Sequence, residues 1–275
     1  MRRNFAQVLK EAGIDLKKEY SRLYESFYLH EPYVVGSRYV SLWGYCASQF
    51  GSYPFRGTCI SLNDFDDTYG FSFDEHPSCF DIDYLVSFCE YSYNLSYYSK
   101  PSNYYHSNLD SYVDEQPSHY VQLVEAIVDK IGYMIVNDEE SDNSFIILPK
   151  LPGAIAVSEI CSQKNSFSVI EYNHFSLKGD LEKKVSILKR LADEIEPRRP
   201  ELKQIPGSPE SELFQMLNKF VRHNNESNPV IASMKPEEIE NVYDDIYQMW
   251  LLSMLELDNV ERKARTKELL GKINK

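Results

Sequence analysis

The residues best suited to chemistry lie at the end of one predicted helix, in the segment LNKFVRHNNESN (217–228). Asn218, Arg222 and Asn225 are spaced so that a helix would place them near one face. His223 is rotated by about 100° from Arg222 in a continuing helix, and the two side chains come together only if the helix ends there. Guanidinium, imidazole and amide groups can hold a phosphate and supply an acid or base near neutral pH. The segment is therefore a candidate phosphate site, with Arg222 and His223 as its catalytic pair.

In this hypothesis the substrate-binding residues are Asn218, Asn224, Asn225 and His174. His174 lies in the sequence Glu-Tyr-Asn-His, shortly before another predicted helix. The alternative interpretation is structural, because basic side chains at a helix C-terminus interact with its unpaired carbonyl groups. His174 has a similar alternative, as a histidine with structural hydrogen bonds alone.

The last hundred residues contain the helices that would position this site. Apolar spacing predicts a helix that begins near Gly179-Asp180 and ends at Pro197. Ser208-Pro209-Glu210 opens a second helix, which we expect to end at Asn224-Asn225. A third helix is predicted from Pro236 to about residue 257, and a basic one over residues 263–273. Together they predict an antiparallel helical bundle.

Three segments of this region resemble the helical domain of bacterial abortive-infection proteins in the HEPN superfamily: EYNHFSLKGDLEKKVSILKRLADEIEP, LFQMLNKFVRHNNESN and IYQMWLLSMLELDN. The resemblance covers about residues 166–260. It implies a four-helix-like bundle that dimerises and, in active members, RNA cleavage without a metal. In that reaction the Arg stabilises phosphate charge and the His assists the ribose hydroxyl. The Arg and His of nuclease members are farther apart in sequence than Arg222 and His223, which are adjacent.

The preceding part of the chain predicts a different kind of region. Tyr, Phe, Ser and Asn are abundant there, which indicates an interior packed with aromatic rings. Apolar patterns and turn residues predict short helices over 4–28, then short helical turns and packed loops over 32–77. They also predict a buried helix over 80–98, a linker or long loop over 99–118, and a helix over 119–131. One β-hairpin follows, with strands over 132–136 and 145–148.

We therefore predict a mainly α protein that is α+β only through a single β-hairpin. Residues 1–117 form the aromatic-rich N-terminal region, and residues 118–275 carry the hairpin and the C-terminal helical bundle.

Composition narrows the possible functions. A net charge of -13 over 275 residues argues against binding duplex DNA, since Lys and Arg must neutralise its phosphates. The acid is concentrated in residues 57–99, which hold eight carboxylates and no Lys or Arg, whereas residues 259–275 are basic. None of the five cysteines forms a CxxC pair, which argues against zinc. A calcium-loop pattern from Asp64 to Glu75 has Tyr69 where the loop needs glycine.

The sequence contains no cofactor-binding motif, and we expect no metal or cofactor. No apolar run is long enough for a membrane span, and the N-terminus lacks the pattern of a signal peptide. We therefore expect a cytoplasmic protein that does not associate with membranes.

Two functional hypotheses follow. In the first, the protein is an anti-phage defence protein of the abortive-infection type that cleaves RNA through Arg222 and His223, as a homodimer formed through the C-terminal bundle. In the second, it is a non-catalytic interaction or nucleotide-sensing module that partners another effector chain. The two differ in whether Arg222 and His223 face an open site or stabilise a helix end.

Overall fold

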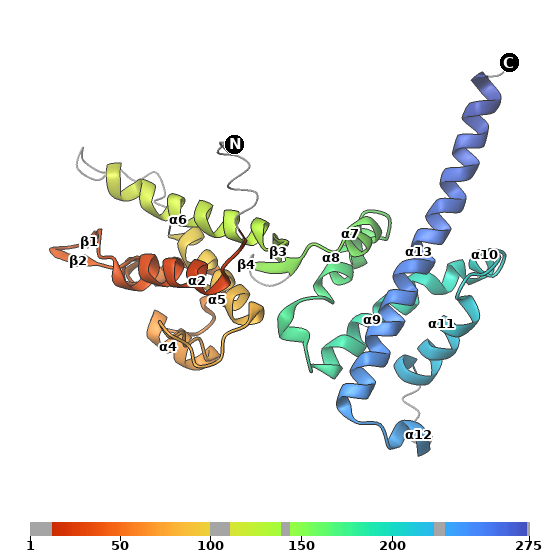
Figure 1. Cartoon of the computed structure of the whole chain (residues 1–275), viewed down its shortest axis with the longest axis horizontal. Coiled ribbons are helices and arrows are strands. Elements are labelled where there is room, and N and C mark those ends of the chain that lie inside the picture. Colours follow the sequence, from red (N-terminus) through yellow and green to blue (C-terminus); the bar gives the residue numbers. More distant parts are fainter. Residues whose placement is uncertain (1–12, 100–110, 139–143, 223–228, 274–275) are drawn as a thin grey trace, which may run out of the picture. The chain divides into compact units, whose positions relative to one another are not determined.

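A computed structural model describes residues 13–99, 111–138, 144–222 and 229–273, with the backbone alone for residues 111–117. The chain divides into two compact units, Met1–Pro149 and Lys150–Lys275 (Figure 1). Both are mainly α-helical, and the strands of the described residues form two small antiparallel hairpins. The division differs from the predicted one at residues 117/118, which falls inside helix α6, because α6 and the hairpin after it pack with helix α5.

The first unit is built around α5, a helix with buried residues on all sides. Its elements are α2 (Leu16–Tyr24), the π-helical turn η1 (Glu25–Leu29), β1 (Tyr33–Val35), β2 (Arg38–Val40), α3 (Leu42–Gln49), the 3₁₀ turns Phe50–Ser52 and Pro54–Arg56, α4 (Leu62–Tyr69), α5 (Ile82–Tyr98), α6 (Ser111–Lys130), β3 (Tyr133–Asp138) and β4 (Ser144–Pro149). The predicted buried helix over 80–98 is therefore confirmed.

Aromatic rings fill the interior of this unit, as the composition predicts. The Phe88 ring lies 5.2 Å from Tyr20 and 5.0 Å from Phe73, both in edge-to-face contacts. Several buried hydroxyl groups find partners among backbone carbonyls. The Tyr53 hydroxyl shares its single proton between the carbonyl oxygens of Cys46 and Leu95, each 3.1 Å away. These rings combine a large apolar area with a polar group that ties helices together.

The predicted hairpin is present as β3 and β4, paired from Tyr133 with Pro149 to Asp138 with Ser144. A second hairpin, β1 with β2, was not predicted. Its strands are three residues each, too short to show an alternating pattern. Gly36 in its turn has a φ of 62°, a conformation that glycine adopts without a steric cost.

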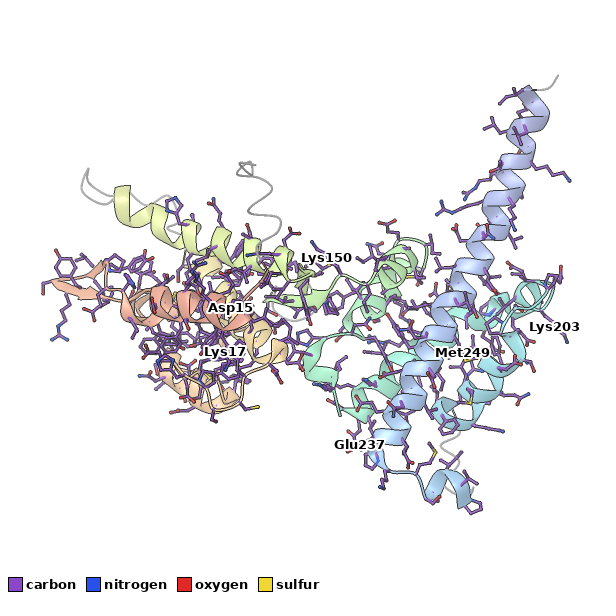
Figure 2. The ribbon with its side chains drawn as sticks, viewed as in Figure 1. Asp15, Lys17, Lys150, Lys203, Glu237 and Met249 are labelled. Atoms are coloured by element: carbon purple, nitrogen blue, oxygen red, sulfur yellow. The ribbon has the colours of Figure 1, made fainter. Side chains whose placement is uncertain are left out.

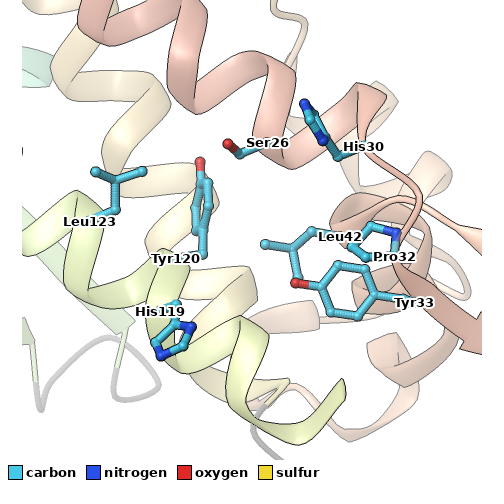
Figure 3. Close-up of a pocket in the computed structure, with 8 residues that line it drawn as sticks. All are labelled: Ser26, His30, Pro32, Tyr33, Leu42, His119, Tyr120 and Leu123. Atoms are coloured by element: carbon cyan, nitrogen blue, oxygen red, sulfur yellow. The ribbon is translucent and has the colours of Figure 1, made fainter. Parts of the chain in front are cut away.

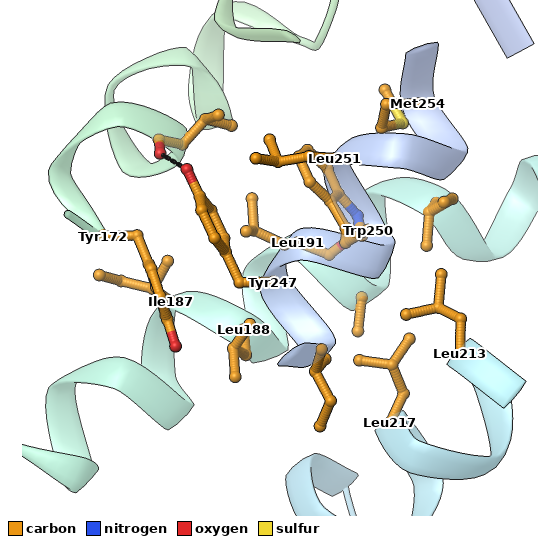
Figure 4. Packing of buried hydrophobic residues seen from close by; sticks show 14 of the residues in the cluster. Tyr172, Ile187, Leu188, Leu191, Leu213, Leu217, Tyr247, Trp250, Leu251 and Met254 are labelled. Atoms are coloured by element: carbon orange, nitrogen blue, oxygen red, sulfur yellow. Dashed lines mark hydrogen bonds between the residues drawn. The ribbon is translucent and has the colours of Figure 1, made fainter. Parts of the chain in front are cut away.

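The second unit is a set of helices packed on α13, with buried apolar residues between them (Figure 4). Its elements are α7 (Pro152–Ser158), α8 (Gln163–Glu171), the 3₁₀ turn η4 (Phe175–Leu177), α9 (Leu181–Ile195), the 3₁₀ turn Glu196–Arg198, α10 (Arg199–Leu202), α11 (Glu210–Met216), the π-helical turn η6 (Leu217–Arg222), α12 (Pro229–Ala232) and α13 (Pro236–Ile273). The Asp180 side chain caps α9 by accepting from Lys183 N, as the predicted start requires.

Helix α13 is longer than predicted. It runs without interruption from Pro236 to Ile273, because no glycine or proline separates the two helices expected there. Leu257 is its last buried residue, and the turns beyond it are largely solvent-exposed (Figure 2). Ion pairs one turn apart, Arg262 with Asp258 and Lys272 with Glu268, support this exposed part.

Candidate functional site

Arg222 lies at the last residue of η6 and reaches across to the C-terminal end of α9. Its Nη1 is 2.5 Å from Glu196 Oε2, and its Nη2 is 3.9 Å from Asp193 Oδ1. Nη2 also donates a hydrogen bond to the Ala192 carbonyl oxygen, 3.4 Å away. The side chain is 26% exposed. The guanidinium therefore makes one hydrogen bond and two ion-pair contacts at one helix end, and Glu196 Oε2 lies close to it without hydrogen-bond geometry.

This arrangement has an electrostatic cause. The last carbonyl groups of a helix lack partners within the helix, and the helix dipole places partial negative charge there. Two carboxylates, of Asp193 and Glu196, add formal negative charge at the end of α9. A phosphate approaching Arg222 would meet both carboxylates and compete with them for the guanidinium. The contacts of Arg222 thus correspond to the structural interpretation of this residue.

Asn218 lies in η6, half-buried, between the buried residues Leu217 and Val221. The chain from 210 to 222 is not one α-helix, since it widens at Leu217 into a π-helical turn. His223, Asn224 and Asn225 lie outside the described residues. Their part in the predicted site, and the point at which the helix ends, stay predictions.

His174 lies in the turn between α8 and α9. Its Nδ1 lies 2.7 Å from Ser176 Oγ and accepts a hydrogen bond from Ser176 N. Successive turn hydrogen bonds, including Leu177 N to His174 O, connect it to the beginning of α9. Arg222 instead contacts the other end of α9, and the 15 residues of that helix span about 22 Å. The structure therefore does not place His174 beside Arg222.

A polar cluster that the sequence did not reveal joins α9 to α13. Lys184 is buried, and its Nζ lies 2.8 Å from Glu240 Oε1 and 2.7 Å from Asp244 Oδ1. Glu240 also accepts from Gly179 N, and this backbone hydrogen bond together with Lys184 lowers the pKa of its carboxyl. The Tyr172 hydroxyl donates to Asp244 Oδ1 at 2.9 Å. With every member partnered, the cluster fastens helices together.

Next to this cluster, two tyrosines are stacked. The rings of Tyr172 and Tyr247 are nearly parallel, with centroids 4.1 Å apart. The Tyr247 hydroxyl donates to the Val169 carbonyl oxygen (dashed in Figure 4) and accepts from the Asn173 amide. The pair joins α13 to α8 through the Val169 carbonyl, while the neighbouring carbonyls at that end of α8 accept from backbone N–H groups.

The first unit contains a cavity of about 340 Å³ (Figure 3). It is lined by Ser26, His30, Pro32, Tyr33, Leu42, His119, Tyr120 and Leu123. These residues come from η1 and the turn after it, from β1, from the start of α3 and from α6, and no local motif connects them. The cavity therefore leaves no signal in the sequence. Its walls combine apolar surface with two imidazoles and a serine hydroxyl, as small-molecule sites commonly do.

Several site classes find no support in the described residues. Among them, no group of three or more His, Cys, Asp or Glu side chains is arranged to hold a metal ion. No described helix combines the length and the apolar character needed to cross a membrane. The five cysteines are all free thiols.

The described structure thus defines a mainly α-helical protein whose predicted phosphate anchor is held by the end of a neighbouring helix. No family model, no characterised protein and no solved structure matches the chain.

Proposed function

We propose that the protein is a non-catalytic interaction module that acts in the cytoplasm with a partner chain. The resemblance to abortive-infection proteins supports a role in anti-phage defence and assembly as a homodimer. The observation that carries the non-catalytic assignment is the position of Arg222, whose guanidinium is held by Glu196, Asp193 and the Ala192 carbonyl. A catalytic arginine needs donors directed at a phosphate, and these donors are directed at the end of α9.

The competing function is metal-independent RNA cleavage by Arg222 and His223. An RNA cleavage assay in EDTA with single-stranded RNA separates the two. We expect no cleavage by the wild type above the level of a His223→Ala variant. Cleavage that disappears in His223→Ala, with the melting temperature unchanged, would establish the ribonuclease and overturn the proposal.

A double-mutant cycle tests the structural role of Arg222 directly. Arg222→Ala leaves the Ala192 carbonyl and the Glu196 carboxylate without this partner, and we expect it to lower the free energy of unfolding by about 1–2 kcal/mol. Glu196→Ala should cost less once Arg222 has been removed, because the two changes share one interaction.

Arg262→Ala is the matched control, since Arg262 is an exposed arginine that pairs with Asp258 on the same unit. We expect it to change stability much less than Arg222→Ala does. Equal effects of Arg222→Ala and Arg262→Ala, or additive effects of the Arg222 and Glu196 changes, would contradict a structural Arg222.

The cavity supports the sensing form of this proposal, in which a small molecule such as a nucleotide binds the first unit. Leu123 lines the cavity and is 37% exposed, so Leu123→Trp can fill the space without disturbing buried packing. The test is the melting temperature with millimolar nucleoside mono-, di- and triphosphates. A rise that is lost in Leu123→Trp and retained in Leu269→Trp, at an exposed position of α13, is the expected result. No rise with any nucleotide would leave the protein as an interaction module without nucleotide sensing.

A further inference from the structure

Strand β4 is an edge strand, paired with β3 on one side only. Successive residues of a strand direct their N–H and C=O groups alternately to its two sides. The N–H groups of Phe145 and Ile147 are bonded to side chains of α5, so these two residues face away from β3. Pro149 is the next residue that faces away from β3, and proline has no N–H to donate. The outer side of β4 therefore carries two backbone donors.

Two side chains of α5 bind both donors. The Asn94 amide accepts from Phe145 N through Oδ1 and donates to Phe145 O through Nδ2, each at 2.7 Å. One turn earlier on the helix, Glu90 Oε2 accepts from Ile147 N at 2.7 Å. Asn94 thus makes with Phe145 the pair of hydrogen bonds that a neighbouring strand would make. We call Glu90 and Asn94 the edge clamp.

Further contacts hold the edge clamp in position. Asn94 is only 9% exposed, and its Nδ2 also donates to the Glu90 carbonyl oxygen at 2.8 Å. The Phe145 ring packs against the Tyr93 and Tyr97 rings of α5, with centroids 5.3 and 4.5 Å away. Helix α5 therefore covers the edge of β4 with hydrogen bonds as well as with apolar contacts.

The strand under the clamp has the composition of a self-associating segment. Phe145, Ile146, Ile147 and Leu148 are consecutive, apolar and uncharged, and the first three have high β propensity. An open edge of this composition templates the addition of another strand, and native proteins cover or charge such edges. Two copies of the same edge can pair antiparallel about a two-fold axis, because each presents the same donors and acceptors.

We propose that the edge clamp closes a latent self-association site, and that the occupant of the opened edge is β4 of a second copy of this chain. With the clamp removed, the N–H groups of Phe145 and Ile147 lose their partners. Helix α5 is then held to β4 by its apolar contacts alone. When α5 moves away from the edge, the β4 strand of a second copy can take its place, forming a four-stranded sheet from two hairpins. In the wild-type protein the clamp therefore prevents β4 from joining an intermolecular sheet. This role does not depend on the partner proposed above.

The test is the double variant Glu90→Ala/Asn94→Ala, examined by size-exclusion chromatography with light scattering. We expect an increase in mass over the wild type that grows with protein concentration. The amides of Phe145 and Ile147 should exchange with solvent faster at low concentration and become protected again at high concentration. The companion variant Glu90→Gln keeps a carboxamide oxygen as acceptor and should behave as the wild type does.

Two further variants separate edge pairing from general unfolding. Val86→Ala removes a buried side chain of the same helix and leaves the clamp intact, so it should lower the melting temperature without raising the mass. Ile146→Lys, added to the double variant, places a charge on β4 and should restore the wild-type mass without restoring the melting temperature.

Two outcomes would overturn the proposal. One is an unchanged mass of Glu90→Ala/Asn94→Ala at millimolar concentration while its Phe145 and Ile147 amides exchange faster. The other is an equal rise in mass for Val86→Ala, or a rise that Ile146→Lys does not suppress.

Discussion

The indole Nε1 of Trp250 in α13 donates a hydrogen bond to the Leu191 carbonyl oxygen in α9, 2.8 Å away and inside the core of the second unit. Both residues are almost completely buried (Figure 4). Trp250 thus joins the two helices through packing and through one directional bond. It also satisfies the polar atom of the largest side chain in this core.

Replacing this tryptophan should destabilise the second unit. Trp250→Phe removes the hydrogen bond and part of the buried volume, and we expect a loss of about 1–3 kcal/mol in the free energy of unfolding. Trp250→Ala should cost about 3–5 kcal/mol. Urea titration followed by circular dichroism measures both. The other tryptophan, Trp43, lies in the first unit and reports by fluorescence whether that unit is affected. An unchanged free energy of unfolding in Trp250→Phe would contradict a stabilising role of the hydrogen bond.

Lys184 should contribute more than the surface ion pairs do. Lys184→Ala leaves Glu240 and Asp244 facing each other without their shared cation, and Asp244 is about half exposed, which reduces the penalty. We expect a loss of about 2 kcal/mol that persists in 1 M salt. Lys272→Ala, which breaks the exposed pair with Glu268, should cost less than about 0.5 kcal/mol. Equal losses for the two variants would show that the burial of Lys184 has no energetic consequence.

Asp66 should make the stability of the first unit depend on pH. Burial raises the pKa of this carboxyl to about 6, although a hydrogen bond from the Tyr91 hydroxyl acts in the opposite direction. A carboxyl that binds its proton more tightly when folded stabilises the protein fully below about pH 4, and this contribution is lost as the pH rises through 6.

Asp66→Asn keeps an oxygen that can accept from Tyr91 and removes the charge. Because the group is only half-buried, we expect a gain of about 1 kcal/mol at pH 7 and no gain at pH 4. Urea titrations at the two pH values measure the difference. Asp67→Asn, at an exposed position of the same helix, removes a charge that makes only a minor contribution to the raised pKa of Asp66, and its gain at pH 7 should be much smaller. A gain that is the same at both pH values would exclude the titration of Asp66 as its cause.

Tyr120 should tolerate the loss of its hydroxyl. The residue is 5% exposed, and its hydroxyl has no well-formed hydrogen bond within the described part of the chain. The neighbouring Ser92 hydroxyl interacts with it only weakly, because Ser92 donates its proton to the Phe88 carbonyl oxygen. A buried hydroxyl without a partner is unfavourable, so Tyr120→Phe should leave the melting temperature unchanged or raise it. Tyr53→Phe is the contrasting variant, because that hydroxyl bonds two carbonyl oxygens and its loss should lower the melting temperature. A lower melting temperature of Tyr120→Phe would show that the Tyr120 hydroxyl makes a stabilising hydrogen bond.

Local signals predicted much of the fold. Asp180 and Pro197 correctly delimit α9, and Pro236 correctly opens α13, because caps and prolines act on the residues beside them. The β3–β4 hairpin follows from two apolar runs around a polar loop. The β1–β2 hairpin escaped prediction because three residues are too few for a pattern. The boundary between the units depends on which helix α6 packs against, and no local signal records that.

The candidate site was less predictable. Helical spacing predicts which residues share a face of one helix, but it does not predict which element packs against that face. The groups that contact Arg222 precede it by about thirty residues, at the end of α9. The apolar spacing of α9 predicts which face of that helix is buried, but not which side chain contacts its C-terminal end. The lining of the cavity is likewise assembled from segments far apart in sequence. These relationships arise only when the elements pack.

Asn94 is followed by Leu95 and Ser96, the acceptor triplet for N-linked glycosylation. The nitrogen that would carry the sugar is the one that donates to the carbonyl oxygens of Glu90 and Phe145, on a side chain with little exposed surface. A folded copy produced in a secretory host should therefore remain unmodified at this position. A glycan attached before folding would prevent α5 from closing over β4, so occupancy at Asn94 would mark molecules that had failed to fold.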